Sequence, residues 1–183
     1  DGSGFEIFAH GLRNPQEIVF DEYGDLFSVD NDADFKNEME RLVFIPEASD
    51  AGWRNNYQYM GERTRWMVER LSEPHWEGQA AFVFPPLASS TNGPAGFKRD
   101  PGTALGEGLR GMYFLNEFPS GDMRGFRLEQ AGASFRRGPV ELLHQGVMGI
   151  GLSWHPDGSL YFADWIGGYP LDKKGAVWRA DVP

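Results

Sequence analysis

Carboxylate side chains gather in one stretch of this 183-residue chain, residues 21–50. The stretch holds ten acidic residues but only two basic ones, Lys36 and Arg41. The acidic residues are Asp21, Glu22, Asp25, Asp30, Asp32, Asp34, Glu38, Glu40, Glu47 and Asp50. Oxygen ligands at this density are what a hard cation such as calcium requires. A solvated loop face is the alternative interpretation, because acidic runs of this kind are common on protein surfaces.

Within that stretch, Asp30, Asp32 and Asp34 alternate along the chain, and Glu38 follows them. Their oxygens converge if the loop curls, so these four residues are the candidate metal ligands. The pattern is not an EF-hand, because the sixth and twelfth positions counted from Asp30 lack the Gly and the Glu that this motif needs. If the loop does not curl, the alternating carboxylates are splayed into water.

Other catalytic chemistries have weaker support. The chain has no cysteine, which excludes disulfides, thiolate metal sites and a cysteine nucleophile. Its four histidines are too scattered for a metal signature, and it contains neither a GxSxG elbow nor a glycine-rich phosphate loop. Among the tryptophans, Trp53, Trp66 and Trp76 are the better candidates for a ligand surface, whereas Trp154 and Trp178 fall in predicted strands and are expected in the core.

Charge and hydropathy exclude two classes of partner. The net charge is -10 and the isoelectric point is about 4.8, which opposes nucleic acid because such binding depends on Lys and Arg. No apolar run approaches the roughly 18–20 residues of a membrane-spanning helix, so no membrane span is predicted. The first residues, DGSGFEIF, show no signal-peptide pattern, and we expect a mature chain, a processed chain or a fragment.

The elements that must position these residues are predicted to be strands. Short apolar or alternating segments recur between turns that are rich in the 24 glycines and 12 prolines. They are FEIFAH, EIVF, DLFSVD, RLVFI, AFVF, GMYFLNEF, MRGFRLE, VELLH, GLSWH, SLYFAD and AVWRADV. One short helix is predicted at residues 62–72, inside a loop-rich insertion at about 46–80. The chain is therefore predicted to be all-β.

A repeated template organises these strands. Residues 18–30, IVFDEYGDLFSVD, and 152–164, LSWHPDGSLYFAD, both read strand, polar turn ending in Gly, strand, Asp. A weaker copy around Gly111 lies 47 residues before Gly158, which is the spacing of a propeller blade. Each copy is predicted to end with an outer strand, in RLVFI, MRGFRLE and AVWRADV.

The template predicts a β-propeller that this chain does not complete. About three four-stranded blades fit in residues 1–183, which we interpret as one partial propeller domain, whereas closed propellers have about four to eight blades. The predicted architecture is half of a six-bladed ring. A single β-sandwich fits less well, because a sandwich rarely repeats such a template.

Three segments carry a family resemblance. The run His10-Gly11-Leu12-Arg13-Asn14-Pro15-Gln16, followed by a strand, a Gly turn and the acidic loop, resembles the quinoprotein glucose/sorbosone dehydrogenases, whose motif reads GxRNPQ. The segments SSTNGPAGFK at 89–98 and DWIGG at 164–168 are similar to the membrane-bound dehydrogenase branch of Planctomycetes-like bacteria. The likeness extends over nearly the full chain.

This resemblance implies a six-bladed propeller that oxidises a sugar or a sugar-like alcohol by hydride transfer to pyrroloquinoline quinone (PQQ), with calcium as a second cofactor. It implies that Arg13 and Asn14 contact the quinone, with Thr91 as a third candidate. Calcium is expected in the acidic loop, in part through main-chain carbonyls, so Ala33 joins the four carboxylates as a candidate ligand. An ordinary turn at the blade entry is the alternative role for Arg13 and Asn14.

The chain also departs from the family pattern. The general-base His of the family precedes the GxRNPQ motif by more than this chain contains, and the later basic residues that hold the quinone carboxylates are not evident. Three functions stay open: a sugar dehydrogenase completed by further blades, a non-catalytic carbohydrate- or protein-binding module, and a calcium-dependent lactonase-like hydrolase. The expected partners are a sugar, the remaining blades and a cytochrome as electron acceptor, in a periplasmic or extracellular bacterial location.

Overall fold

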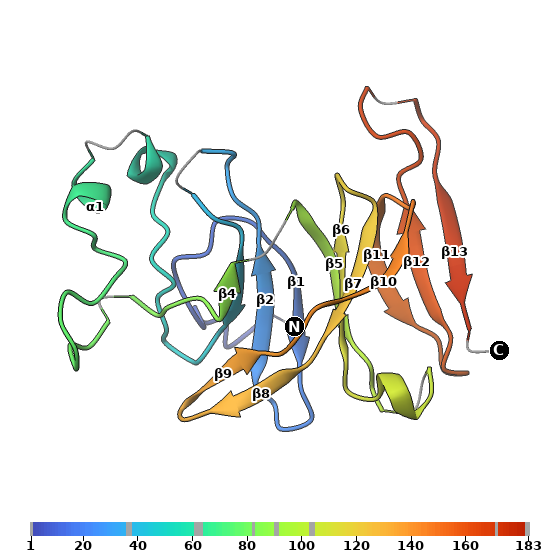
Figure 1. Ribbon diagram of the computed structural model, residues 1–183, viewed down its shortest axis with the longest axis horizontal. Helices are drawn as coiled ribbons and strands as arrows, with labels where there is room; N and C mark the ends of the chain where they lie inside the picture. Colours follow the sequence, from blue (N-terminus) through green and yellow to red (C-terminus); the bar gives the residue numbers. More distant parts are fainter. Residues whose placement is uncertain are drawn as a thin grey trace.

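The computed structural model describes residues 2–35, 38–60, 64–81, 83–89, 92–102, 105–170 and 172–181. Thr91, one of the expected quinone contacts, lies outside this set. Three antiparallel sheets stand side by side in chain order, and a long connection extends from the first of them (Figure 1). No described helix is long and apolar enough to cross a membrane.

The sheets are built from consecutive segments of the chain. The first has the order β1 (Pro15–Phe20), β2 (Leu26–Asp30), β3 (Arg41–Phe44) and β4 (Ala88–Ser89). The second has the order β5 (Pro94–Arg99), β6 (Tyr113–Glu117), β7 (Asp122–Phe126) and β10 (Glu141–Gln145). The third has the order β11 (Gly149–Trp154), β12 (Leu160–Asp164) and β13 (Ala176–Ala180). A separate hairpin joins β8 (Leu128–Ala131) to β9 (Ser134–Arg137).

The first strand of each sheet lies nearest to the neighbouring sheets, since β5 contacts both β1 and β11. From this inner side, each sheet continues outward strand by strand, which is the arrangement of propeller blades. Two short 3-10 helices, η1 (Asn56–Tyr59) and η2 (Glu107–Leu109), and the single-turn α1 (Arg65–Val68) lie in connections between strands.

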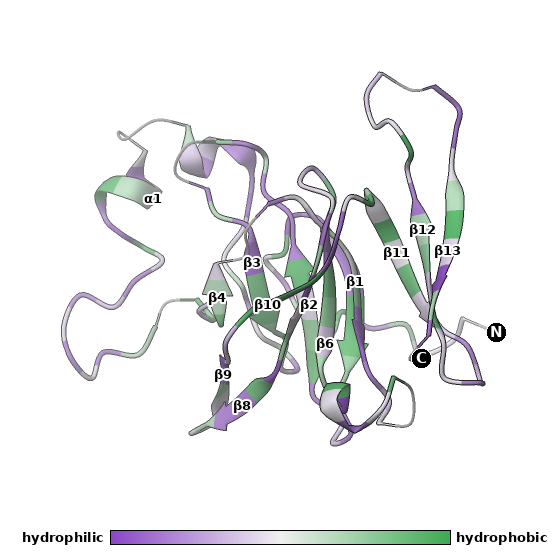
Figure 2. Ribbon diagram, turned by 45° about the vertical axis from the view of Figure 1, so that its right-hand side comes forward, coloured by the Kyte–Doolittle hydropathy of each residue, from purple (hydrophilic) through white to green (hydrophobic). Residues whose placement is uncertain are grey.

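The second sheet has apolar residues on both faces because it is covered on both sides. Tyr113 and Leu115 of β6 belong to the core shared with the first sheet, whereas Phe114 belongs to the core shared with the third. Successive side chains of a strand point to opposite faces, so one buried strand serves two cores. Every residue of β6 is buried as a result, and Figure 2 shows hydrophobic stretches along the packed strands.

The outer edge of the third sheet differs from that of the other two. Among the described residues, no strand pairs with the free edge of β13, and Val177 on this strand is 71% exposed. Trp178 is 47% exposed, so the prediction that it lies in the core is wrong in this structure; its indole N–H donates to Asp164 at 2.9 Å. Trp154, by contrast, packs against the core between the second and third sheets.

Several strand predictions need correction. RLVFI and MRGFRLE contain the third strands of their sheets, β3 and β7, and not the outer ones; the outer strands are β4 and β10, which follow long connections. FEIFAH forms no strand beyond a single bridge from His10 to Asp50, because Phe5 and Ile7 are exposed and have no partner strand. The described residues of AFVF are also outside any strand.

Three strands were absent from the predictions. β5 begins with Pro-Ala-Gly, which is typical of a turn, and it forms a strand because β1, β6 and β11 surround it. The other two are β4 and β9. In the predicted helix at 62–72, only α1 is helical, and residues 62 and 63 lie outside the described residues. Residues 45–87 connect β3 to β4 within the first sheet.

Candidate functional site

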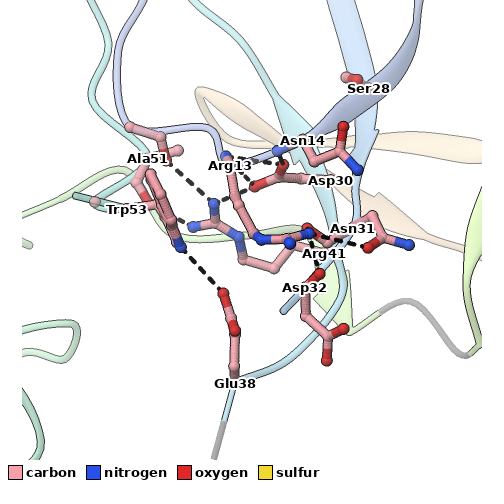
Figure 3. Close-up of polar contacts among 12 residues, drawn as sticks. Arg13, Asn14, Ser28, Asp30, Asn31, Asp32, Glu38, Arg41, Ala51 and Trp53 are labelled. Atoms are coloured by element: carbon pink, nitrogen blue, oxygen red, sulfur yellow. Dashed lines mark hydrogen bonds and ion pairs between the residues drawn. The ribbon is translucent and has the colours of Figure 1, made fainter. Parts of the chain in front are cut away.

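The carboxylate of Asp30 is the centre of a buried hydrogen-bond network at the end of β2 (Figure 3). It is 2% exposed, and it accepts the backbone N–H of Arg13 at 3.0 Å and that of Asn14 at 2.7 Å. It also forms an ion pair with Arg41, its cross-strand neighbour on β3. The Arg41 guanidinium donates in turn to the carbonyls of Gly11 and Ala51. Asp30 therefore fixes the GxRNPQ turn against the sheet.

The guanidinium of Arg13 is directed into the acidic loop. Its Nη1 lies 3.1 Å from both the carbonyl oxygen and the side-chain oxygen of Asn31, and it also donates to the carbonyl of Asp32. Three oxygens thus surround one positive nitrogen. Main-chain carbonyls of this loop were expected to bind calcium. Here the carbonyls of Asn31 and Asp32 accept hydrogen bonds from the Arg13 guanidinium.

The other expected metal ligands also have protein partners. Glu38 accepts the backbone N–H of Ala33 at 2.9 Å through Oε2 and the indole N–H of Trp53 at 3.1 Å through Oε1. Asp32 accepts the backbone N–H of Asp34 at 3.1 Å. Within the described part of the chain, no group of three or more acidic or imidazole side chains is arranged to hold a metal ion. Calcium, whose six to eight ligands must be oxygens, would have to compete with these partners for the oxygens of the loop.

Replacing Arg13 with Met tests this assignment. We expect Arg13→Met to destabilise the fold by about 1–3 kcal/mol, because the partly buried oxygens of Asn31 and Asp32 lose a charged donor. That loss corresponds to a fall in Tm of roughly 2–10 °C in a chain of this size, measured by thermal unfolding. Arg65→Met is the matched control, because Arg65 is 84% exposed and forms a surface ion pair with Glu69.

The same scans are repeated with calcium and with EDTA. We expect the Tm of the wild-type chain to be equal in both, since the guanidinium already donates to the loop carbonyls of Asn31 and Asp32. A clear rise of the wild-type Tm with calcium would contradict the assignment and restore the predicted calcium site.

A groove of about 470 Å³ lies where the three sheets meet, at the end of the fold next to this network. All three sheets contribute to it: Asn14 precedes β1, Phe118 follows β6 and Trp165 follows β12. The full lining is Asn14, Gln16, Asn31, Asp34, Glu40, Asn92, Gly93, Pro94, Ala95, Phe118, Pro119, Ile150, Trp165 and Tyr169. We call these residues the inter-sheet groove. Of the expected site residues, Asn14 and Asp34 line it.

One side of the inter-sheet groove is aromatic. The rings of Phe118 and Trp165 stack with centroids 5.0 Å apart, and Tyr169 meets Trp165 edge to face at 4.6 Å. Tyr169 is 76% exposed, so its ring is available to a ligand. The other side is polar, with four carboxamides from Asn14, Gln16, Asn31 and Asn92 and two carboxylates.

Glu40 carries the more enclosed of those carboxylates. Its Oε1 accepts the backbone N–H of Gly93, and its buried Oε2 has no hydrogen-bond partner among the described residues. Burial raises the pKa of Glu40 above its ordinary value; the Gly93 hydrogen bond opposes this, while nearby Asp32, Glu117 and Asp34 add to it. Sequence reasoning counted Glu40 in the acidic stretch but assigned it no role. Trp165 was part of the DWIGG resemblance, but Trp53, Trp66 and Trp76 were preferred to it as candidates for a ligand surface.

The inter-sheet groove does not fit the carboxylates of PQQ. None of its described lining residues is Lys, Arg or His. Arg13 is held by Asn31 and Asp32, and Arg124 is held by Glu117 at 2.7 Å and by Asp122 at 2.7 Å. A polyanionic ligand needs positive partners, and here it would face Asp34 and Glu40.

Comparisons with known proteins were made on sequence and on structure. No family model and no curated protein matches the sequence. In structure, the chain is similar to an oxidoreductase described as a glucose dehydrogenase from Thermus thermophilus, with 18% identity, a TM-score of 0.67, and coverage of 95% of this chain and 47% of that one. A second glucose dehydrogenase gives 16% identity and a TM-score of 0.68, with coverage of 100% and 49%.

A third similar structure is the soluble aldose sugar dehydrogenase from Escherichia coli, with 14% identity, a TM-score of 0.60, and coverage of 97% of this chain and 48% of that one. The chain has the β-propeller fold of these proteins. The predicted fold class is thus confirmed. The chain spans about half the length of the matched structures. The six-bladed ring and the likeness to the Planctomycetes branch remain predictions.

Proposed function

We propose that this chain forms one wall of a sugar-binding site at the centre of a sugar dehydrogenase-like propeller. The observation that carries the proposal is the inter-sheet groove, which combines aromatic and polar lining residues at the junction of three sheets. The groove lies at the junction of the sheets, and in propellers the blades surround a central channel at this place. The likeness in fold to glucose and aldose sugar dehydrogenases supports the same assignment.

The lining matches the chemistry of a sugar. The C–H face of a pyranose ring is apolar and packs on an aromatic ring, for which Trp165 and the exposed Tyr169 are placed. Sugar hydroxyls donate and accept at the same time, so carboxamides and carboxylates can satisfy both functions. A few convergent polar groups beside an apolar wall are the usual composition of a small-molecule site.

In this proposal, oxidation of the bound sugar requires a longer protein that includes the remaining blades. The GxRNPQ motif and the fold support a quinoprotein dehydrogenase, with hydride transfer from a sugar hydroxyl, but the described residues supply neither the cations nor the metal ligands that PQQ and calcium need. Those groups and a general base would have to come from the remaining blades. A cytochrome acceptor and a periplasmic or extracellular location are part of the same proposal.

The second candidate is a non-catalytic carbohydrate-binding module. The absence of a cation from the described lining of the inter-sheet groove favours it, because a module that only binds sugar has no need to hold a quinone. Reduction of an electron-acceptor dye that requires added PQQ would contradict this candidate. No observation on the described residues favours the lactonase-like hydrolase.

Trp165→Ala tests the sugar site. We expect the wild-type chain to bind glucose or a related aldose, and we expect Trp165→Ala to weaken this binding about tenfold, because the aromatic platform is lost. The aldose is titrated into each variant, and binding is monitored by saturation-transfer NMR. Trp76→Ala is the matched control, since Trp76 is 66% exposed and lies outside the inter-sheet groove. Equal weakening in both variants, or no binding of any aldose by the folded wild-type chain, would contradict the proposal.

A further inference from the structure

The polar side of the inter-sheet groove has an unbalanced negative charge. Asp34 and Glu40 line it, and Asp32 and Glu117 lie close enough to interact electrostatically with Glu40. The nearby cations are already engaged: Arg13 with the carbonyls of the acidic loop, Arg41 with Asp30, and Arg124 with Glu117 and Asp122. A ligand in the inter-sheet groove therefore meets a negative potential that the described residues do not neutralise.

Two carboxylate oxygens at this position also lack donors. Glu40 Oε2 and Glu117 Oε1 are both buried, and neither has a hydrogen-bond partner in the described part of the chain. Glu117 is only 1% exposed. A buried acceptor of this kind is costly if it stays unsatisfied. Glu40 lines the inter-sheet groove, so a small shift of its side chain would bring this oxygen within reach of a charged donor on a ligand.

We propose that the inter-sheet groove selects a sugar with a free ammonium group, an amino sugar, over neutral and acidic sugars. This inference rests on the sugar site proposed above and specifies its ligand. An ammonium group has three N–H donors and a positive charge, which matches the carboxylate of Glu40 with Asp34 beside it. The sugar ring packs on Trp165 and Tyr169, as for any aldose.

A metal ion fits these residues less well. Calcium needs six to eight oxygen ligands, and the described residues contain no group of three or more side chains arranged to bind an ion. An ammonium group needs three acceptors at most. An acidic sugar would place its carboxylate against Asp34 and Glu40, which opposes binding.

The test compares four sugars of similar size on the wild-type chain at low ionic strength: glucosamine, N-acetylglucosamine, glucose and glucuronate. We expect glucosamine to bind about tenfold more tightly than glucose, as one additional charge-assisted hydrogen bond predicts. We expect N-acetylglucosamine to follow glucose, because acetylation removes the charge, and glucuronate to bind most weakly. Methylammonium is added as a probe that carries the charge without a sugar ring.

Glu40→Gln is the informative variant, since it keeps an oxygen to accept the Gly93 N–H and removes the charge. We expect it to lose most of the preference for glucosamine over glucose. Asp34→Asn is a second variant that the fold should accept, because the φ of +60° at this position is one that Asn adopts readily; its glucosamine preference should fall in part. Glu107→Gln is the control, because Glu107 is exposed and precedes β6, at the end opposite Phe118.

The outcomes separate the two proposals. Equal binding of glucosamine and glucose by the wild-type chain would overturn the amino-sugar inference and leave the sugar site intact. A preference that is undiminished in Glu40→Gln, or methylammonium binding as tight as that of glucosamine, would also overturn it. Failure of all four sugars to bind would overturn the proposed function itself.

Discussion

Asp30→Ala is expected to lower the stability of this chain by about 3–5 kcal/mol, the loss typical of a buried ion pair broken on one side. Asp30 is 2% exposed and Arg41 is 12% exposed, so the guanidinium would stay buried without its counter-charge. The backbone N–H groups of Arg13 and Asn14 would lose their acceptor as well. A loss of this size corresponds to a fall in Tm of roughly 6–20 °C, and urea unfolding followed by tryptophan fluorescence measures it.

The matched control removes an acid from an exposed pair. Glu129 and Arg136 are 54% and 73% exposed, and Glu129→Ala should cost less than about 1 kcal/mol. If Asp30→Ala costs no more than Glu129→Ala, the Asp30 network does not hold the GxRNPQ turn. The variant has a functional consequence too, because Asn14 and Asn31 reach the inter-sheet groove from segments that Asp30 and Arg13 fix. We expect sugar binding to be lost together with stability.

Phe27→Ala is expected to have a comparable effect, about 3–5 kcal/mol, for a different reason. Phe27 of β2 is fully buried between the first two sheets, and its ring meets Phe135 at 4.9 Å, Phe44 at 5.4 Å and Tyr113 at 5.7 Å. Removing the ring leaves a cavity where four aromatic side chains meet. Because those partners come from β3, β6 and β9, the substitution loosens the docking of one sheet on the next.

Calorimetry or urea unfolding of Phe27→Ala, Phe27→Leu and Phe5→Ala checks this expectation. Phe27→Leu keeps most of the volume and should cost less than Phe27→Ala. Phe5 is 90% exposed, and Phe5→Ala should change the free energy of unfolding by less than about 0.5 kcal/mol. A Phe27→Ala loss as small as that of Phe5→Ala would show that the two sheets do not depend on this aromatic cluster.

The fold class could be predicted from the sequence because its signals are local. Alternation of apolar residues and the Gly-terminated turns define β1, β2, β11 and β12, and the repeated template correctly indicates propeller blades. The strands that escaped prediction are those whose state depends on neighbours. β5 starts with Pro-Ala-Gly, and only its position between β1 and β11 makes it a strand. β4 also escaped prediction, and β10 was predicted as a strand but not as an outer one. Both are far along the chain from the strands with which they pair.

For the candidate site, the sequence by itself determined which residues are close in the chain. The GxRNPQ motif and the acidic loop are such neighbours, and the structure brings Arg13, Asn14 and Asp30 together as hydrogen-bond partners. Only the tertiary structure decided which partners they have, because a guanidinium and a calcium ion are alternative partners for the same carbonyls. It also decided that Glu40 and Trp165 share a groove. They are distant in sequence and lie on different sheets, and packing of three blades around a common centre is what brings them together.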